Sequence, residues 1–164
     1  MYQLGVFVEG ASEARYDLGV VIKDSDNLVP AFQSISRMFW RAEKEQFDSY
    51  GLRGGAEWLP LSYRYAKWKH KHYPGRPLMV LTGELRRSLT GKSAKSYLYY
   101  DRHKMAIGTT VSYAPYHQSG TRKMPRRPLI ALTKDDAMDY AKEIQKHVMK
   151  GLTKQERIAR KVFL

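Results

Sequence analysis

Cysteine is missing from this 164-residue sequence. Its absence excludes disulfide bonds, thiolate metal sites and cysteine nucleophiles, and it fits synthesis inside a cell. No apolar run approaches the ~20 residues that cross a bilayer. The first residues, MYQLGVFVEGASEAR, carry acids where a secretory signal would carry cations. We therefore expect a soluble protein that is not exported through a signal peptide.

Acidic residues are scarce in the middle of the chain. Between Glu57 and Asp135 only Glu84 and Asp101 are acidic, whereas lysines and arginines recur throughout, and the formal net charge is +13. We expect one strongly positive region that attracts polyanions such as nucleic acid, acidic protein surfaces or anionic lipid. The alternative is a solvated basic face that only keeps the protein in solution.

The residues of a catalytic centre are also missing. The middle of the chain has too few carboxylates for an acid–base pair, and no Gly-x-Ser-x-Gly turn or phosphate-binding glycine loop is present. His117 lies near Ser119 but has no obvious carboxylate to orient it. The five histidines lack thiolate partners, so solvated histidines are favoured over a metal site. We predict no enzyme, no catalytic or metal-binding residues and no cofactor.

Hydrophobic periodicity predicts a mixture of strands and helices. Five apolar residues at alternating steps of four and three indicate one buried face of a helix from about Pro30 to Tyr50: Leu28, Phe32, Ile35, Phe39 and Ala42. A second long helix begins after Thr133 and ends near Gly151, with a buried stripe of Ala137, Ala141, Ile144 and Val148. Short helices are predicted at Tyr63–His72 and Gly83–Leu89, and strands at Tyr2–Val8, Tyr16–Lys23, Ser96–Tyr100, Lys104–Val111 and Leu129–Leu132.

These elements predict an α+β fold, in which an antiparallel sheet packs with two longer helices and short helices occupy the connecting loops. Residues 1–152 are expected to form a single domain, of which residues 1–15 are an N-terminal strand extension. Residues 153–164 are expected to form a basic C-terminal tail or arm.

The segment Tyr113–Leu129, YAPYHQSGTRKMPRRPL, combines tyrosines, cations and three prolines. It is too polar for a core and, by its prolines, disfavoured as a helix or central strand. We expect an ordered loop displayed at the end of a sheet.

Two stretches combine cations with aromatic residues. Arg64, Lys67, Lys69 and Lys71 alternate with Tyr63, Tyr65, Trp68 and Tyr73, and a second basic cluster covers residues 122–127. Cations beside aromatic rings suit phosphate contact with base stacking. Because no DNA-reading motif is present, and such aromatic residues more often pack in a core or interface, non-specific contact with DNA is the alternative that stays open.

Several short motifs, in this order and spacing, resemble the phage virion morphogenesis family. They are Phe47, GGAEWLPLS (residues 54–62), Lys67, LTGELRRSL (81–89), Ile107-Gly108-Thr109, YAPYHQSG (113–120) and PRRPL (125–129). The resemblance covers about residues 16–152, and the basic run Arg64–Arg76 is richer in cations than the family pattern.

The resemblance implies a structural, non-catalytic protein of a tailed bacteriophage that completes the head-proximal end of the tail and joins it to the head or neck. Such a tail terminator would be a homo-oligomeric ring, with a hexamer favoured, at the tail–neck junction of the virion after assembly in the host cytoplasm. Its partners would be neck or connector proteins, the tail tube protein and, transiently, genomic DNA in the lumen.

A ring needs two different complementary patches on each subunit and benefits from a positive lumen. The predicted subunit or neck contacts are Trp40, Trp58, Pro60, Leu61, Tyr113, Tyr116 and His117. The predicted lumen or DNA contacts are Arg64, Lys67, Lys69, Lys71, Arg122, Lys123, Arg126 and Arg127. The alternative function is a non-specific DNA-binding protein that uses these basic, aromatic segments.

Overall fold

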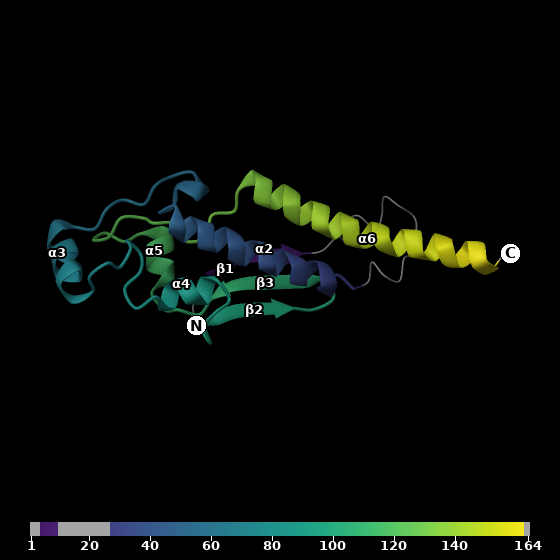
Figure 1. Ribbon diagram of the computed structural model, residues 1–164, viewed down its shortest axis with the longest axis horizontal. Coiled ribbons are helices and arrows are strands. Elements are labelled where there is room, and N and C mark those ends of the chain that lie inside the picture. The colour runs from purple at the N-terminus through teal and green to yellow at the C-terminus, as the bar shows by residue number, and fades with distance from the viewer. Residues whose placement is uncertain (1–3, 10–26, 163–164) are drawn as a thin grey trace. The chain divides into compact units, whose positions relative to one another are not determined.

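The computed structural model describes residues 4–9 and 27–162, with side chains described over residues 27–149. Its elements are β1 (Leu4–Glu9), α2 (Val29–Asp48), the 3-10 turn η2 (Leu52–Gly54), α3 (Tyr63–His72), α4 (Glu84–Leu89), β2 (Ser96–Tyr100), β3 (Lys104–Thr109), α5 (Ala114–Ser119) and α6 (Lys134–Val162) (Figure 1). The fold is α+β, as predicted. The predicted strand Tyr16–Lys23 lies outside the described residues.

The three strands form one sheet in the order β1-β3-β2. β2 and β3 are an antiparallel hairpin whose turn is closed by Asp101, because its carboxylate accepts hydrogen bonds from the backbone N–H groups of His103 and Lys104 at 2.8 and 2.9 Å. β3 is buried from Met105 to Thr109, whereas β2 is half-buried or exposed. The hairpin predicted from the sequence is confirmed.

The contacts divide the chain into two compact units. Unit 1 comprises Met1–Val6, Met38–Leu98 and Ile107–Leu132, and unit 2 comprises Phe7–Arg37, Tyr99–Ala106 and Thr133–Leu164. The prediction of a single domain over residues 1–152 stays a prediction.

Helix α2 follows its predicted pattern closely. All five residues of the predicted stripe are buried, and Phe32 and Ile35 are fully so. Asn27 caps the helix, since its side-chain oxygen accepts the N–H of Val29 at 3.1 Å. Periodic burial of apolar side chains, rather than intrinsic propensity, therefore defines this helix.

Helix α6 begins as predicted. Thr133 and Asp136 form a reciprocal capping box, in which Asp136 N–H donates to the Thr133 hydroxyl at 3.1 Å and Thr133 N–H donates to the Asp136 carboxylate at 2.9 Å. Its predicted end and stripe were wrong. The helix continues past Gly151 to Val162, and Tyr140 is buried while Ala141 is exposed, because the larger Tyr140 turns the buried face by one residue.

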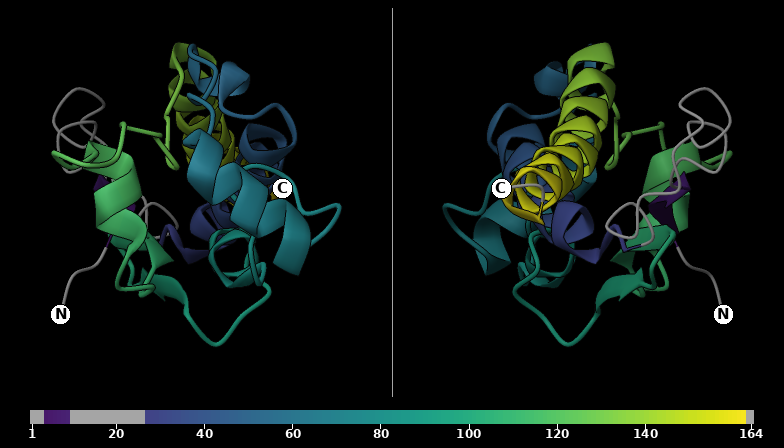
Figure 2. Two further views of the ribbon diagram at one scale, coloured as in Figure 1. Left: turned by 90° about the vertical axis from the view of Figure 1, so that its left-hand side faces the viewer. Right: turned by 90° about the vertical axis from the view of Figure 1, so that its right-hand side faces the viewer.

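Unit 1 holds its own hydrophobic core. Eight buried residues pack together there: Phe47, Trp58, Val80, Leu85, Leu89, Val111, Ala114 and Leu129. Helices α3, α4 and α5 belong to this unit, and Figure 2 shows them from two sides. The described chain ends and the loops between the short helices position the site considered next.

The segment Tyr113–Leu129 is not a loop throughout. It contains α5, which begins at Ala114 and carries Pro115 in its first turn. Proline is compatible with that position, because the first N–H groups of a helix have no partner inside it. The prediction that the prolines exclude a helix was therefore wrong.

Candidate functional site

Residues 129–132, predicted as a strand, are irregular in structure, and a side chain takes the place of a neighbouring strand. The Gln118 side-chain oxygen accepts the N–H groups of Leu129 and Ile130 at 2.7 and 3.1 Å. Its amide nitrogen donates to the carbonyl of Ile130 at 2.8 Å. One glutamine from α5 thus satisfies three backbone groups that a strand would pair in a ladder.

The preceding carbonyl, that of Pro128, is held from α2 and from the loop after it. Gln46 donates its side-chain amide to this oxygen at 3.0 Å, and the Trp58 indole N–H donates at 2.8 Å. The Trp58 ring meets Phe47 edge-on with centroids 5.3 Å apart. Gly51 makes room for this ring: it has φ +92°, and a Cβ there would lie 2.5 Å from Trp58 Cδ1. Together these contacts fix the course of residues 127–130.

Two cations of unit 1 are buried: Lys69 is 6% exposed and Arg127 is 3% exposed. Lys69 donates to the carbonyl oxygens of Pro77 and Leu78 at 2.5 and 3.3 Å. Arg127 donates to those of Leu59 and Pro60 at 2.8 Å each. Burial lowers the pKa of both side chains. Each cation thus braces a loop of its own chain.

These two cations line a groove of about 750 Å³ on unit 1, which we call the basic groove. Its apolar lining includes Leu61, Leu78, Val80, Leu85, Met124 and Pro125. Its polar lining includes Lys69, Glu84, Lys95, His117, Lys123 and Arg127. A concave apolar surface with a few polar groups is the usual form of a binding site.

His117 stands out in the groove because its ring is only partly satisfied. The Nδ1 atom is buried and makes no hydrogen bond within the described residues, and the ring meets Tyr113 edge-on at 6.1 Å. Burial first, and then the charge of Arg127, lower the pKa of His117. Burial and the charge of Glu84 raise the pKa of Tyr113. Both rings therefore favour their neutral forms.

Acidification should destabilise the fold through His117. Its folded pKa lies below the ordinary 6.5, so the unfolded chain binds this proton more readily. The stabilising contribution of the neutral ring is complete above pH ~6.5 and is lost as the pH falls through the folded pKa. Urea unfolding between about pH 8 and pH 5 should show this loss. The His117→Gln variant should lack it, and an unchanged pH dependence in that variant would contradict the assignment.

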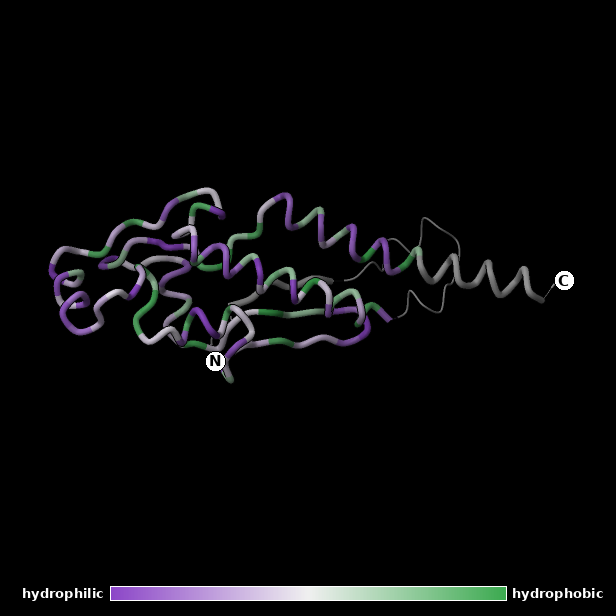
Figure 3. The backbone as a smooth tube through the Cα atoms, viewed as in Figure 1, coloured by the Kyte–Doolittle hydropathy of each residue, from purple (hydrophilic) through white to green (hydrophobic). Residues whose placement is uncertain are grey.

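Helix α3 carries two adjacent exposed rows. Tyr65, Trp68 and His72 stack along one row, with Trp68 at 5.4 Å from Tyr65 and 5.0 Å from His72 between ring centroids. Arg64, Lys67 and Lys71 have the same spacing one residue earlier and are exposed. Figure 1 shows α3 at an end of unit 1, apart from β2 and β3, and Figure 3 shows it as largely hydrophilic. The helix therefore presents cations beside aromatic faces.

The seven predicted contact residues occupy different environments. Trp58 is 3% exposed and supports the site from inside. Trp40 is half-buried over Gly91, where φ is +71° and a Cβ would lie 2.6 Å from the indole ring. Leu61 and His117 are also half-buried, whereas Pro60, Tyr113 and Tyr116 are exposed. The contact role of these residues stays a prediction, and Trp58 offers no surface to a partner in this structure.

The predicted basic contacts fall into two groups. Six are exposed and so accessible to a partner: Arg64, Lys67, Lys71, Arg122, Lys123 and Arg126. Lys69 and Arg127 are the buried cations described above. The sequence signal for Lys69 was its place on the same face of α3 as Ala66 and Tyr73, both half-buried. Lys95, in the basic groove, was missed because nothing in the local sequence distinguishes it.

The chemistry of the site is that of binding. Among the side chains of residues 27–149, no group of three or more histidine, aspartate or glutamate residues could hold a metal ion. In the part of the chain that the structure describes, no helix has the length and apolar character needed to cross a membrane. What remains is a partly apolar groove, exposed aromatic rings and exposed cations, which are features of surfaces that contact macromolecules.

Comparison with known proteins defines the class: the chain is a structural component of a phage virion. It belongs to the phage virion morphogenesis family, which matches residues 12–150. Over 117 residues it is 31% identical to the Mu-like prophage FluMu G protein 1 of Haemophilus influenzae, covering 70% of this chain and 75% of that protein. No solved structure matches the chain.

Proposed function

We propose that this protein completes the head-proximal end of a phage tail as a ring, the tail terminator, and joins the tail to the head or neck. The family match over residues 12–150 carries the proposal. A hexamer is the favoured ring, at the tail–neck junction, with neck or connector proteins and the tail tube protein as partners. Exposed large apolar side chains on unit 1 support contacts of this kind; Tyr63 is 83% exposed and Leu52 65%.

The test is to interrupt the gene in the phage that encodes this chain and to examine the lysate by electron microscopy. DNA-filled heads and separate tails should accumulate, and the chain supplied in trans should restore joined particles. Antibody against a tagged chain should label the tail–neck junction. Joined particles in normal number without the protein would refute the proposal.

Contact with DNA is the second candidate function, and the two rows of α3 favour it. Cations beside stacked aromatic rings suit a nucleic acid backbone. A ring that DNA traverses would place these cations in its lumen, whereas a neck contact would place them against protein. The exposed cations at residues 122, 123 and 126 form the second set that could serve either role.

Reversing the charges of each set distinguishes these roles. In R64E/K67E/K71E, a lumen position predicts joined particles with impaired DNA release, and a neck position predicts unjoined particles. The salt dependence of DNA binding by the free chain should fall by about 0.9 per lost phosphate contact. The same measurements apply to R122E/K123E/R126E. Normal infectivity of both triple variants would contradict either role for these cations.

A further inference from the structure

The basic groove carries positive charge that its own chain leaves uncompensated. The buried cations Lys69 and Arg127 donate only to backbone carbonyls, and no carboxylate among residues 27–149 forms an ion pair with either. Buried charges are normally paired, because removing an ion from water is costly. The groove is therefore suited to a ligand that brings an anion.

The rim adds to this charge. Lys95 and Lys123 line the groove and are exposed. Glu84 also lines it but is engaged elsewhere, since it accepts hydrogen bonds from Ser93 at 2.5 Å and from Arg87 at 3.0 Å. With apolar residues between the cations, the complementary ligand has carboxylates flanking an apolar side chain.

The start of α6 has this chemistry. Asp135, Met138 and Asp139 lie at positions i, i+3 and i+4, so they share one helical face, and all three are exposed. Met138 is 52% exposed. Asp139 contacts Lys142 at 3.1 Å in an exposed pair, which is weak and readily exchanged for another partner. This acidic face with its apolar residue is distinct from the capping carboxylate of Asp136.

We propose that the basic groove of one copy of this chain receives the Asp135–Asp139 face of α6 from a second copy. The carboxylates meet Lys95 and Lys123 above the buried cations, and Met138 enters the apolar lining. A contact between two different patches is heterologous, and repeated around an axis it closes a ring. This inference deepens the proposed function, because it names the two surfaces that build the terminator ring.

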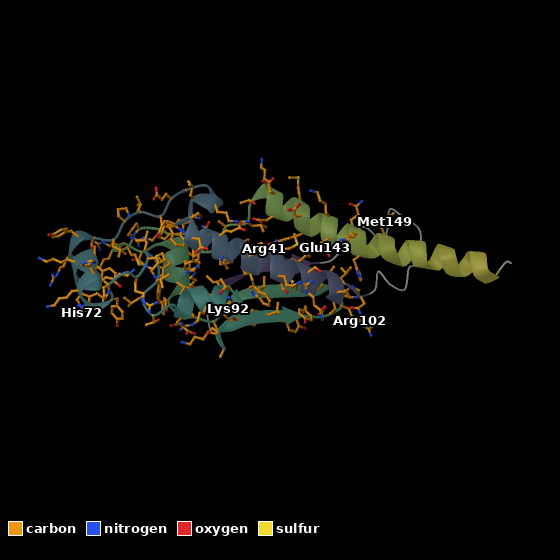
Figure 4. The ribbon with its side chains drawn as sticks, viewed as in Figure 1. Arg41, His72, Lys92, Arg102, Glu143 and Met149 are labelled. Carbon is orange, nitrogen blue, oxygen red and sulfur yellow. The ribbon has the colours of Figure 1, made fainter. Side chains whose placement is uncertain are left out.

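The test uses the full-length chain and four forms of it. One variant reverses the groove, K95E/K123E; one reverses the helix, D135K/D139K; and a third combines all four changes. The matched control K92E/R102E changes the charge as much as the groove variant, at exposed residues that precede and follow β2 and do not line the groove (Figure 4). Thermal unfolding verifies that each form is folded, and mass photometry measures assembly.

The wild type and the control should form closed rings, while either reversed variant alone should weaken self-association about 100-fold or more through like-charge repulsion. Mixing the two reversed variants should give dimers and no rings, because each keeps one intact patch of opposite type. The combined variant should recover rings, since its charges are complementary again. Rings formed by either single-patch variant, or no recovery in the combined variant, would overturn the inference.

Two further results separate this inference from the proposed function. A wild-type chain that stays monomeric at every soluble concentration and still restores joined particles overturns the inference alone, since the groove then has another occupant. The same holds if neck protein is cross-linked to Lys95 or Lys123 in particles. Rings that form as described but fail to restore joined particles refute the proposed function and leave the groove contact standing.

Discussion

Replacing Trp58 by alanine should lower the free energy of unfolding by about 3–5 kcal/mol, the usual cost of deleting a buried aromatic side chain. The indole is 3% exposed, packs against Phe47 and donates to the Pro128 carbonyl at 2.8 Å. The variant therefore loses apolar burial and leaves one of the hydrogen bonds to that oxygen unmade. Urea unfolding followed by circular dichroism measures the change.

Two variants bracket the Trp58 result. Trp58→Phe keeps an aromatic ring but loses the N–H donor, so its loss should be smaller than that of alanine. Leu59→Ala changes the exposed neighbour, which is 57% exposed, and should stay within about 0.5 kcal/mol of the wild type. Equal stability of the wild type and Trp58→Ala would show that the indole is a surface group, as the sequence had suggested.

Gln118→Leu should destabilise the chain by about 3 kcal/mol or more, because each part-buried polar group left without a partner costs about 1–3 kcal/mol. Leucine has a similar shape but can neither accept the N–H groups of Leu129 and Ile130 nor donate to the Ile130 carbonyl. Hydrogen exchange should show the two amides losing protection at the same time. This joint loss is specific to the hydrogen bonds, since a packing defect would not select these amides.

Gln118→Glu supplies the matched comparison. A carboxylate keeps the acceptor for the two N–H groups but removes the donor to Ile130, so the loss of stability should lie between those of the wild type and leucine. Ser119→Ala, at the exposed end of α5, should have little effect. If leucine and glutamate variants were equally stable, the acceptor role of Gln118 would be excluded.

Local periodicity predicted those elements whose burial depends on near neighbours. The stripe Leu28 to Ala42 repeats with the period of a helix and is buried as a unit, and the bounds of α3 agree with the prediction. The hairpin followed from two adjacent strand patterns. In each case the residues that decide the structure are close together in the sequence.

The errors share a different cause, which is contact across long separations. Gln46 meets the Pro128 carbonyl across 82 residues, and Arg127 meets Leu59 across 68. Nothing near residue 58 or 127 announces these contacts, so Trp58 and Arg127 were assigned to the surface by residue type. The apolar run Leu129–Leu132 resembled a strand because the sequence does not reveal that a glutamine side chain takes the hydrogen bonds of its backbone.

That glutamine also decides how a neighbour can meet residues 127–130. The N–H groups of Arg127, Leu129 and Ile130 and the carbonyls of Pro128 and Ile130 already have partners within the chain. An incoming peptide therefore finds few backbone groups with which to extend this segment by an added strand. In a crowded infected cell, where many identical copies accumulate before assembly, such self-sufficiency protects against edge-to-edge aggregation and leaves side chains to choose the partner.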